Sequence, residues 1–183
     1  EWKPTPQLLT SNLQPLTSNV TYLSYSQIQT FDICPLHYKL KYILKIPVPQ
    51  TAAQSFGTTI HSTLRDFYQA WMRGEKLQIN KVITVLEKNW INEGYTSRSH
   101  EHSAFEKAKR ISLGYLRKNF SSENLPIALE LPFKFVIKNL KIGGRIDRID
   151  KIDKNTIEIL DYKTGDNIPE EKELGNNLQL TFY

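Results

Sequence analysis

The spacing of the apolar residues changes near Pro126, and this change constrains the fold more than any other feature of the chain. Before Pro126 apolar residues recur with helical spacing and form one stripe, namely Ile60, Leu64, Phe67 and Trp71. After Pro126 apolar and polar residues alternate in the segment LELPFKFVI (129–137), which is typical of a half-buried strand. Helices followed by strands favour the α+β class over a regular alternation of the two.

The helical part begins after a polar leader. Residues 1–22 hold three prolines and no periodic pattern, so we expect a linker or an extended tail there and one domain over 23–183. Ser24 and Gln27 form a capping-box pattern at the start of a first helix. Proline disfavours helical geometry in the residue before it, so Cys34 should end that helix, and segment 36–44 can resume it.

Three longer helices are expected next, over residues 56–74, about 80–93 and 103–120, with Gly74 as a C-terminal cap. Ser103 and Glu106 form a second capping-box pattern, which leaves His100 and His102 as isolated loop residues before the helix. Three consecutive strands with short turns then predict an antiparallel meander, and the segment NLQLTFY (177–183) opens a final helix.

Composition limits the chemistry but does not choose a substrate. Lys plus Arg minus Asp plus Glu is 24 − 19 = +5, which favours polyanionic partners only weakly. No apolar run approaches a membrane span. The chain has no P-loop, HExxH or GxSxG motif, and a single cysteine excludes a site built from several cysteines of this chain. Its one methionine is Met72, so we expect an excerpt of a longer protein.

Carboxylates on neighbouring strands carry the strongest chemical signal. The pleat of IEILDYKTG (157–165) places Asp161 and Lys163 on one face. Asp147 and Asp150 alternate to opposite faces of the preceding strand, so one of them can join Asp161. Two ionised carboxylates about 4 Å apart repel by roughly 4 kcal/mol at an effective dielectric of 20, and a divalent cation such as Mg²⁺ or Mn²⁺ relieves that repulsion. The alternative is a solvated Asp–Lys pair that closes a hairpin.

Five segments that follow one another in a particular order along the chain make that alternative less favoured. They are LSYSQIQTFDICPLHYKLKY (23–42), FGTTIHSTL (56–64), GGRIDRID (143–150), IEILDYKTG (157–165) and NLQLTFY (177–183). Together they resemble the RecB-like branch of the PD-(D/E)XK nuclease superfamily, whose members include modules fused to UvrD-like helicases, AddB-type proteins and CRISPR-associated nucleases. The resemblance implies a restriction-endonuclease-like α+β core, with a mainly antiparallel central sheet flanked by helices and an N-terminal helical part.

The resemblance also implies roles for particular residues. Asp147, Asp161 and Lys163 match the catalytic positions, and both aspartates would bind metal. The further metal ligands would be His61 and the main-chain carbonyl of Tyr162. Gln179 and Tyr183 match a Q-x-x-x-Y motif that positions DNA, and their spacing puts both on one helical face.

Other residues near these motifs allow two interpretations. Glu130 is either a group that supports the metal ligands or a solvated strand residue. Arg145 and Arg148 can contact phosphates or balance the aspartates, and Asp150 is expected to point outward toward Arg148 or Lys151. Cys34 matches a position that supplies one iron–sulfur ligand in some relatives. An iron–sulfur cluster cannot form from this cysteine alone, so we expect a small buried side chain.

The function implied by the resemblance is a Mg²⁺- or Mn²⁺-dependent deoxyribonuclease, with exonuclease as the expected mode. Its partners would be single-stranded DNA or duplex ends and a UvrD-like helicase, fused or separate, in DNA repair and recombination. The expected location is a bacterial cytoplasm, at the nucleoid and not at a membrane. The alternatives are a non-catalytic DNA-binding or scaffolding module that retains the fold, and a CRISPR-associated RecB-like exonuclease. A metal hydrolase acting on other substrates would leave Lys163 and Gln179 unexplained.

Overall fold

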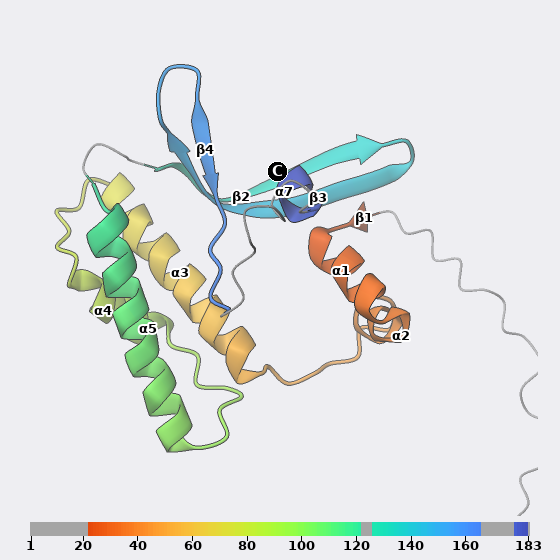
Figure 1. The fold of residues 1–183 in the computed structure, drawn as a ribbon, viewed down its shortest axis with the longest axis horizontal. Helices are drawn as coiled ribbons and strands as arrows, with labels where there is room; N and C mark the ends of the chain where they lie inside the picture. Colours follow the sequence, from red (N-terminus) through yellow and green to blue (C-terminus); the bar gives the residue numbers. More distant parts are fainter. Residues whose placement is uncertain (1–21, 122–125, 166–177, 183) are drawn as a thin grey trace, which may run out of the picture.

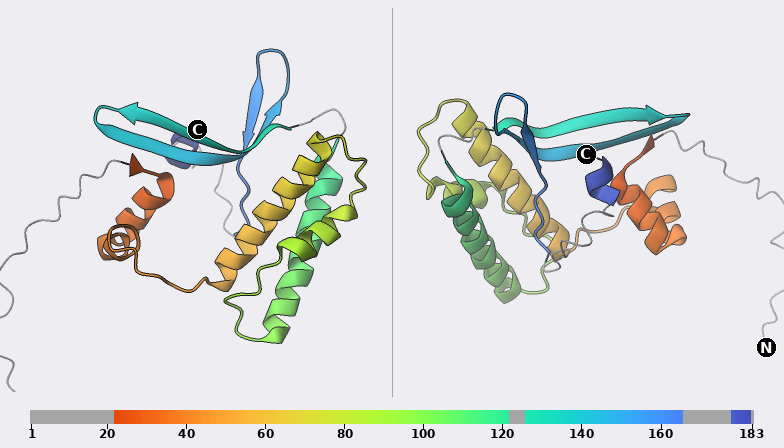
Figure 2. Two further views of the ribbon diagram at one scale, coloured as in Figure 1. Left: turned by 180° about the vertical axis from the view of Figure 1, so that it is seen from behind. Right: turned by 45° about the horizontal axis from the view of Figure 1, so that its top comes forward.

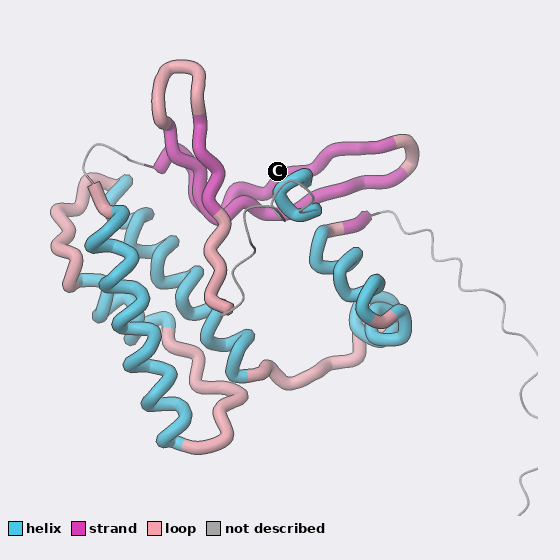
Figure 3. Tube along the Cα trace, viewed as in Figure 1, coloured by secondary structure: helices cyan, strands magenta, loops and turns pink. Residues whose placement is uncertain are grey.

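The computed structural model describes residues 22–121, 126–165 and 178–182, in which helices lie along one side of a four-stranded sheet (Figure 1). Two groups of helices are seen, one below each end of the sheet, and Figure 3 shows the strands gathered above both. This arrangement confirms the α+β class and is consistent with a restriction-endonuclease-like fold. None of the helices among the described residues is long and apolar enough to cross a membrane.

The N-terminal helices follow their capping residues. In α1 (Tyr25–Ile33) the Ser24 side chain accepts from the Gln27 N–H and Gln27 reaches back, which confirms the capping box. Cys34 is extended (φ −159°, ψ 105°), so α2 (Pro35–Tyr38) starts anew and continues into the π-helix η1 (Lys39–Ile43). The prediction of a buried Cys34 is wrong, since this free thiol is partly exposed in the break between the two helices.

Helix α3 (Ala52–Met72) is the centre of the helical core. It begins earlier than predicted because Thr51 accepts from the Gln54 N–H and Gln54 accepts from the Thr51 N–H, a capping box that fixes the first turn. The predicted stripe is buried through Phe67, with Trp71 packed partly buried at its end. Gly74 takes φ +84° after the last turn, as expected of a residue that ends a helix.

Helices α4 (Lys81–Asn89) and α5 (Arg98–Asn119) pack on α3. The former ends earlier than predicted because Trp90 leaves helical geometry (φ −64°, ψ 124°). The predicted start of α5 at Ser103 is wrong by one and a half turns, since the Ser97 side chain accepts from the His100 N–H and caps the helix there. His100 and His102 are therefore helical residues and not loop residues.

The sheet confirms the antiparallel meander. Strand β3 (Leu140–Lys151) pairs with β2 (Pro126–Ile137) along its length and with β4 (Ile157–Leu160) at its C-terminal half. A short β1 (Tyr22–Leu23) pairs in parallel with the start of β3, so Tyr22 belongs to the sheet and not to the tail. Residues 1–21 lie outside the described residues.

The apolar side of β2 is less buried than its alternation predicts. Leu131, Phe135 and Ile137 are 42%, 39% and 52% exposed. The physical reason is that the β2–β3 hairpin extends beyond α3, α4 and α5, and only its open end crosses them (Figure 1). Leu129, near that end, packs against the helical core, so burial follows the position of the helices and not the alternation alone.

The chain ends in a short helix, α7 (Leu178–Phe182), which confirms the predicted final helix and contacts α1. Its position beneath the β2–β3 hairpin, seen in both orientations of Figure 2, brings Gln179 back to the sheet. Tyr183, the second residue of the Q-x-x-x-Y motif, lies outside the described residues.

The glycine pair in β3 is required by the close approach of β2. A Cβ on Gly143 would lie 2.7 Å from the carbonyl oxygen of Phe133, whereas a Cβ on Gly114 in α5 would meet nothing within 4 Å. We expect Gly143→Ala to lower the free energy of unfolding by about 1–3 kcal/mol. Gly114→Ala should raise it by about 0.5–1 kcal/mol, because alanine favours helix. Urea unfolding followed by circular dichroism measures both, and equal stability of the two variants would contradict this account.

Candidate active site

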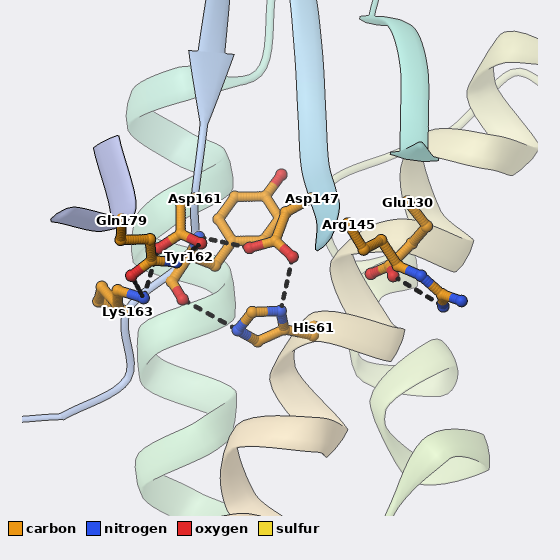
Figure 4. A network of polar contacts seen from close by, with 8 residues as sticks. All are labelled: His61, Glu130, Arg145, Asp147, Asp161, Tyr162, Lys163 and Gln179. Carbon is orange, nitrogen blue, oxygen red and sulfur yellow. Dashed lines mark hydrogen bonds and ion pairs between the residues drawn. The ribbon is translucent and has the colours of Figure 1, made fainter. Parts of the chain in front are cut away.

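His61 joins the helical core to the sheet (Figure 4). Its Nδ1 lies 3.2 Å from Asp147 Oδ1 on β3, and its Nε2 lies 2.9 Å from the carbonyl oxygen of Tyr162, just after β4. The Tyr162 N–H donates to the other oxygen of Asp147 at 2.7 Å. Helix α3, which is distant in the chain, therefore meets β3 and the segment after β4 at one histidine and one aspartate.

The electrostatics of His61 follow from these contacts. Both ring nitrogens face oxygen acceptors, so both donate only when the imidazole is protonated. Burial alone lowers the pKa of His61, but the hydrogen bond and charge of Asp147, aided by the Tyr162 carbonyl and Glu130, outweigh burial and raise this pKa overall. The groups around His61 thus favour its protonated form.

Glu130 lies close enough to His61 and Asp147 to be a metal ligand itself and not only a group that supports the ligands. Single ligand atoms of His61, Glu130 and Asp147 all lie within 4.8 Å of one another. The backbone of Glu130 has φ +50°, and the β2–β3 pairing skips it between Leu129↔Arg148 and Leu131↔Ile146. Position 130 therefore falls opposite Asp147, and its carboxylate reaches the same point as the histidine.

This donor set fits a small divalent cation. It offers one imidazole nitrogen and carboxylate oxygens from two residues, and the Tyr162 carbonyl is already bonded to the same histidine. Oxygen-rich sets of this kind suit Mg²⁺ and Mn²⁺. His61, Glu130 and Asp147 are the residues that would hold it.

Asp161, Lys163 and Gln179 form a second group beside the first (Figure 4). Lys163 Nζ lies 2.6 Å from Asp161 Oδ2 and donates to Gln179 Oε1 at 2.8 Å. The Gln179 amide in turn donates to Asp161 Oδ1 at 2.8 Å. The motif pair of Asp161 and Lys163 therefore projects on one side, as its spacing predicts, and α7 contacts both of its charges. Asp161 is not one of the three converging ligands described above.

The family model of the PD-(D/E)XK nuclease superfamily matches residues 22–183. The chain belongs to this superfamily. The matched range starts at β1 and includes His61, Asp147, Asp161 and Lys163, so the PD-(D/E)XK match spans both polar groups.

The chain is also similar to individual proteins, two of which are named as helicase/deoxyribonuclease subunits. The chain is 28% identical over 163 residues to an uncharacterised protein of Rickettsia bellii, covering 83% of this chain and 20% of that protein. It is 26% identical over 198 residues to one of the subunits of the ATP-dependent helicase/deoxyribonuclease of Clostridium perfringens, covering 88% of this chain and 17% of that protein. The corresponding protein of Caldanaerobacter subterraneus is 24% identical over 195 residues, covering 87% of this chain and 17% of that protein. The chain thus spans about a fifth of the length of the curated relatives it matches.

The two arginines beside Asp147 have different surroundings in this PD-(D/E)XK domain. Arg145 is mostly exposed and lies 3.4 Å from Glu130, so it borders the site. Arg148 is 2% exposed and donates through Nε to Asp150 at 2.6 Å. The expectation that Asp150 points outward is wrong, because α3 covers strand β3 here and Asp150 is buried. The Tyr68 ring of α3 lies 3.9 Å from the Arg148 guanidinium. Arg148 is therefore buried and cannot reach a phosphate.

This buried cation supports the site through Tyr162. The Tyr162 ring packs edge-on against Tyr115 at 5.5 Å, and Arg148 lies close enough to both Tyr162 and Tyr68 to influence their ionisation. Burial, partly opposed by Arg148, raises the pKa of Tyr68 to about 12, so this ring stays neutral. The side chain of Tyr162 packs, partly buried, against the helical core while its main chain contacts His61 and Asp147.

Removing one charge of the buried pair should be costly. Asp150→Asn would leave the Arg148 cation buried without its counter-ion, and we expect the free energy of unfolding to fall by about 3–5 kcal/mol. Glu75→Gln is the matched control, since the Arg73–Glu75 pair is also short at 2.9 Å but more than half exposed on both sides. It should cost less than about 1 kcal/mol. Chemical denaturation of both variants measures the difference, and similar losses would contradict the role given to burial.

Proposed function

We propose that this chain is a divalent-metal-dependent deoxyribonuclease module that hydrolyses phosphodiester bonds. The observation that carries the proposal is the convergence of His61, Glu130 and Asp147 beside the Asp161–Lys163 pair. A metal hydrolase acting on other substrates would need His61, Glu130 and Asp147 and would leave the Asp161–Lys163 pair unexplained. An exposed ammonium next to a cation site is suited to an anionic substrate such as a phosphodiester.

DNA as the substrate is supported by the names of the relatives. The Clostridium perfringens relative is named as part of a helicase/deoxyribonuclease, and the net charge of +5 suits a polyanion. We extend the proposal to an association with a helicase, fused or separate, and to work on DNA ends in repair. Exonuclease action is the mode we propose for such ends.

The residues have distinct roles in this proposal. A bound divalent cation would supply a polarised water and neutralise charge that develops on the phosphate. Lys163, 58% exposed at its side chain, would donate to a phosphate oxygen or hold the attacking water, while Asp161 orients its ammonium. His61 would hold the cation through a neutral ring nitrogen, and Tyr162 keeps Asp147 in place by its N–H.

Substitution of the motif pair tests the activity. We expect labelled single- and double-stranded DNA to be cleaved with Mg²⁺ or Mn²⁺ and not with EDTA. Lys163→Ala and Asp161→Asn should each lower the cleavage rate at least about 100-fold, because the first removes the ammonium proposed to act on the phosphate and the second removes the carboxylate that orients it. Asp153→Asn, in the exposed turn before β4, is the matched control and should keep the wild-type rate.

Two results would overturn the catalytic proposal. One is cleavage that persists in both motif variants, which would indicate a contaminating enzyme. The other is binding of DNA without cleavage under every metal condition, which would favour the non-catalytic DNA-binding module. Such binding should fall steeply with salt, because phosphate contacts release counterions.

Gln179 should act by orienting the motif pair. Gln179→Leu removes the bonds to both Asp161 and Lys163 while the ion pair itself remains. Loss of a hydrogen bond to a charged group corresponds to a drop of about tenfold in kcat, with little change in stability. Leu178→Ala, on the exposed side of α7, is the control. An unchanged kcat in Gln179→Leu would show that the amide has no role in positioning.

A further inference from the structure

A pocket of about 450 Å³ lies next to the catalytic segment, between the N-terminal halves of α3 and α5. Its floor includes Ala53 and Phe56 of α3, and its far wall includes Tyr95 and Lys107. Thr164 and Gly165, which directly follow Lys163, close the near side. This volume falls within the usual range of small-ligand sites.

The pocket and the candidate active site are built on the same two segments. The segment after β4 that carries Asp161 and Lys163 runs along α3 (Figure 1). Thr164, the next residue, lies close to this helix, since a Cβ on Gly57 would lie 3.3 Å from the Thr164 hydroxyl. Gly57 is one helical turn before His61. The α3 residues that line the pocket, from Ala52 to Phe56, precede His61 of the proposed cation site by about one and a half to two and a half helical turns.

The wall of the pocket is aromatic and held in place. The Tyr95 ring stacks on Trp90 at 5.6 Å and 13°, and the His100 ring packs edge-on against Tyr95 at 5.3 Å. Trp90 is itself fixed by its indole N–H, which donates to Glu101 at 3.1 Å. These contacts leave little freedom to the wall, so an aromatic ligand would meet a preformed surface.

The charge of the pocket suits an anion. Its described lining contains Lys107 and His100 and no aspartate or glutamate. The Lys107 ammonium lies 5.8 Å from the centre of the Phe56 ring, at the boundary between the apolar floor and the solvent. Aromatic surfaces combined with a cation at the rim are the features that bind bases and phosphates of single strands.

We propose that this pocket holds one nucleotide of the DNA strand whose neighbouring phosphate lies at Lys163. The base would lie against Phe56 and the Tyr95 wall, and Lys107 would contact a phosphate. The inference rests on the proposed function, because the same strand must reach the motif pair. It adds a subsite that grips the base without reading its sequence, since the wall offers ring faces and edges.

Binding of matched oligonucleotides to the full chain in EDTA tests the pocket without cleavage. Fluorescence anisotropy compares a labelled octamer of thymidylate with an abasic octamer of the same charge. We expect wild type to bind the thymidylate octamer about tenfold more tightly, in line with the stacking of a base on an aromatic wall. Ala53→Trp, which fills the pocket, should abolish this preference, and Lys107→Gln should weaken both octamers about threefold through the lost phosphate contact. Gln69→Trp on α3 and Lys118→Gln on α5 are the exposed controls and should bind as wild type.

The same variants separate this inference from the nuclease proposal. With metal present, Ala53→Trp and Lys107→Gln should raise KM several-fold and leave kcat nearly unchanged, because neither touches the motif pair. Cleavage by wild type without any preference for the thymidylate octamer would overturn the pocket and leave the nuclease proposal standing. A preference that Ala53→Trp removes, in a chain that never cleaves, would support the pocket and overturn the nuclease proposal.

Discussion

The hydrogen bonds of His61 hold the helical core and the sheet in a fixed relation. Helix α3 contributes the ring, β3 contributes the carboxylate of Asp147, and the segment after β4 contributes both the N–H and the carbonyl of Tyr162. A buried carboxylate is costly unless its oxygens are satisfied, and here the Tyr162 N–H donates to one oxygen while the His61 ring lies in hydrogen-bond distance of the other. The position of Lys163, the residue after Tyr162, therefore depends on a bond network centred on His61 and Asp147.

Much of the fold follows from the periodicity of the sequence, because helices and strands bury their apolar residues at different spacings. The stripe of α3 and the meander of the strands were predictable for this reason. The start of α5 was not, because the capping-box pattern at Ser103 and Glu106 gave no sign that the Ser97 side chain caps the helix six residues earlier. The exposure of Phe135 was also not predictable, since alternation does not say where the covering helices end.

The candidate site divides in the same way. His61 and Asp147 lie in one polar group, and Asp161, Lys163 and Gln179 lie in a second group beside it. The metal-binding role expected of Asp161 stays a prediction. The part played by Glu130 could not be predicted from alternation, because φ +50° departs from the ordinary pleat at that residue. Both Leu129 and the Glu130 carboxylate then approach the helices, which consecutive residues of a regular strand do not do. The one signal for the position of Glu130 was the register of the β2–β3 hairpin, which places this residue opposite Asp147.

The unusual backbone of Glu130 has a physical consequence for the site. A non-glycine residue with positive φ costs about 1–3 kcal/mol, and such strain persists only where the surroundings enforce it. Here β3 enforces it on one side, and the contact of Leu129 with the helical core enforces it on the other. Glu130, His61 and Asp147 are thus held on the inner side, while Lys163 remains exposed on the outer side. Thr164 and Gly165, which directly follow Lys163, line the neighbouring pocket, so the segment after β4 connects the motif pair to the aromatic wall.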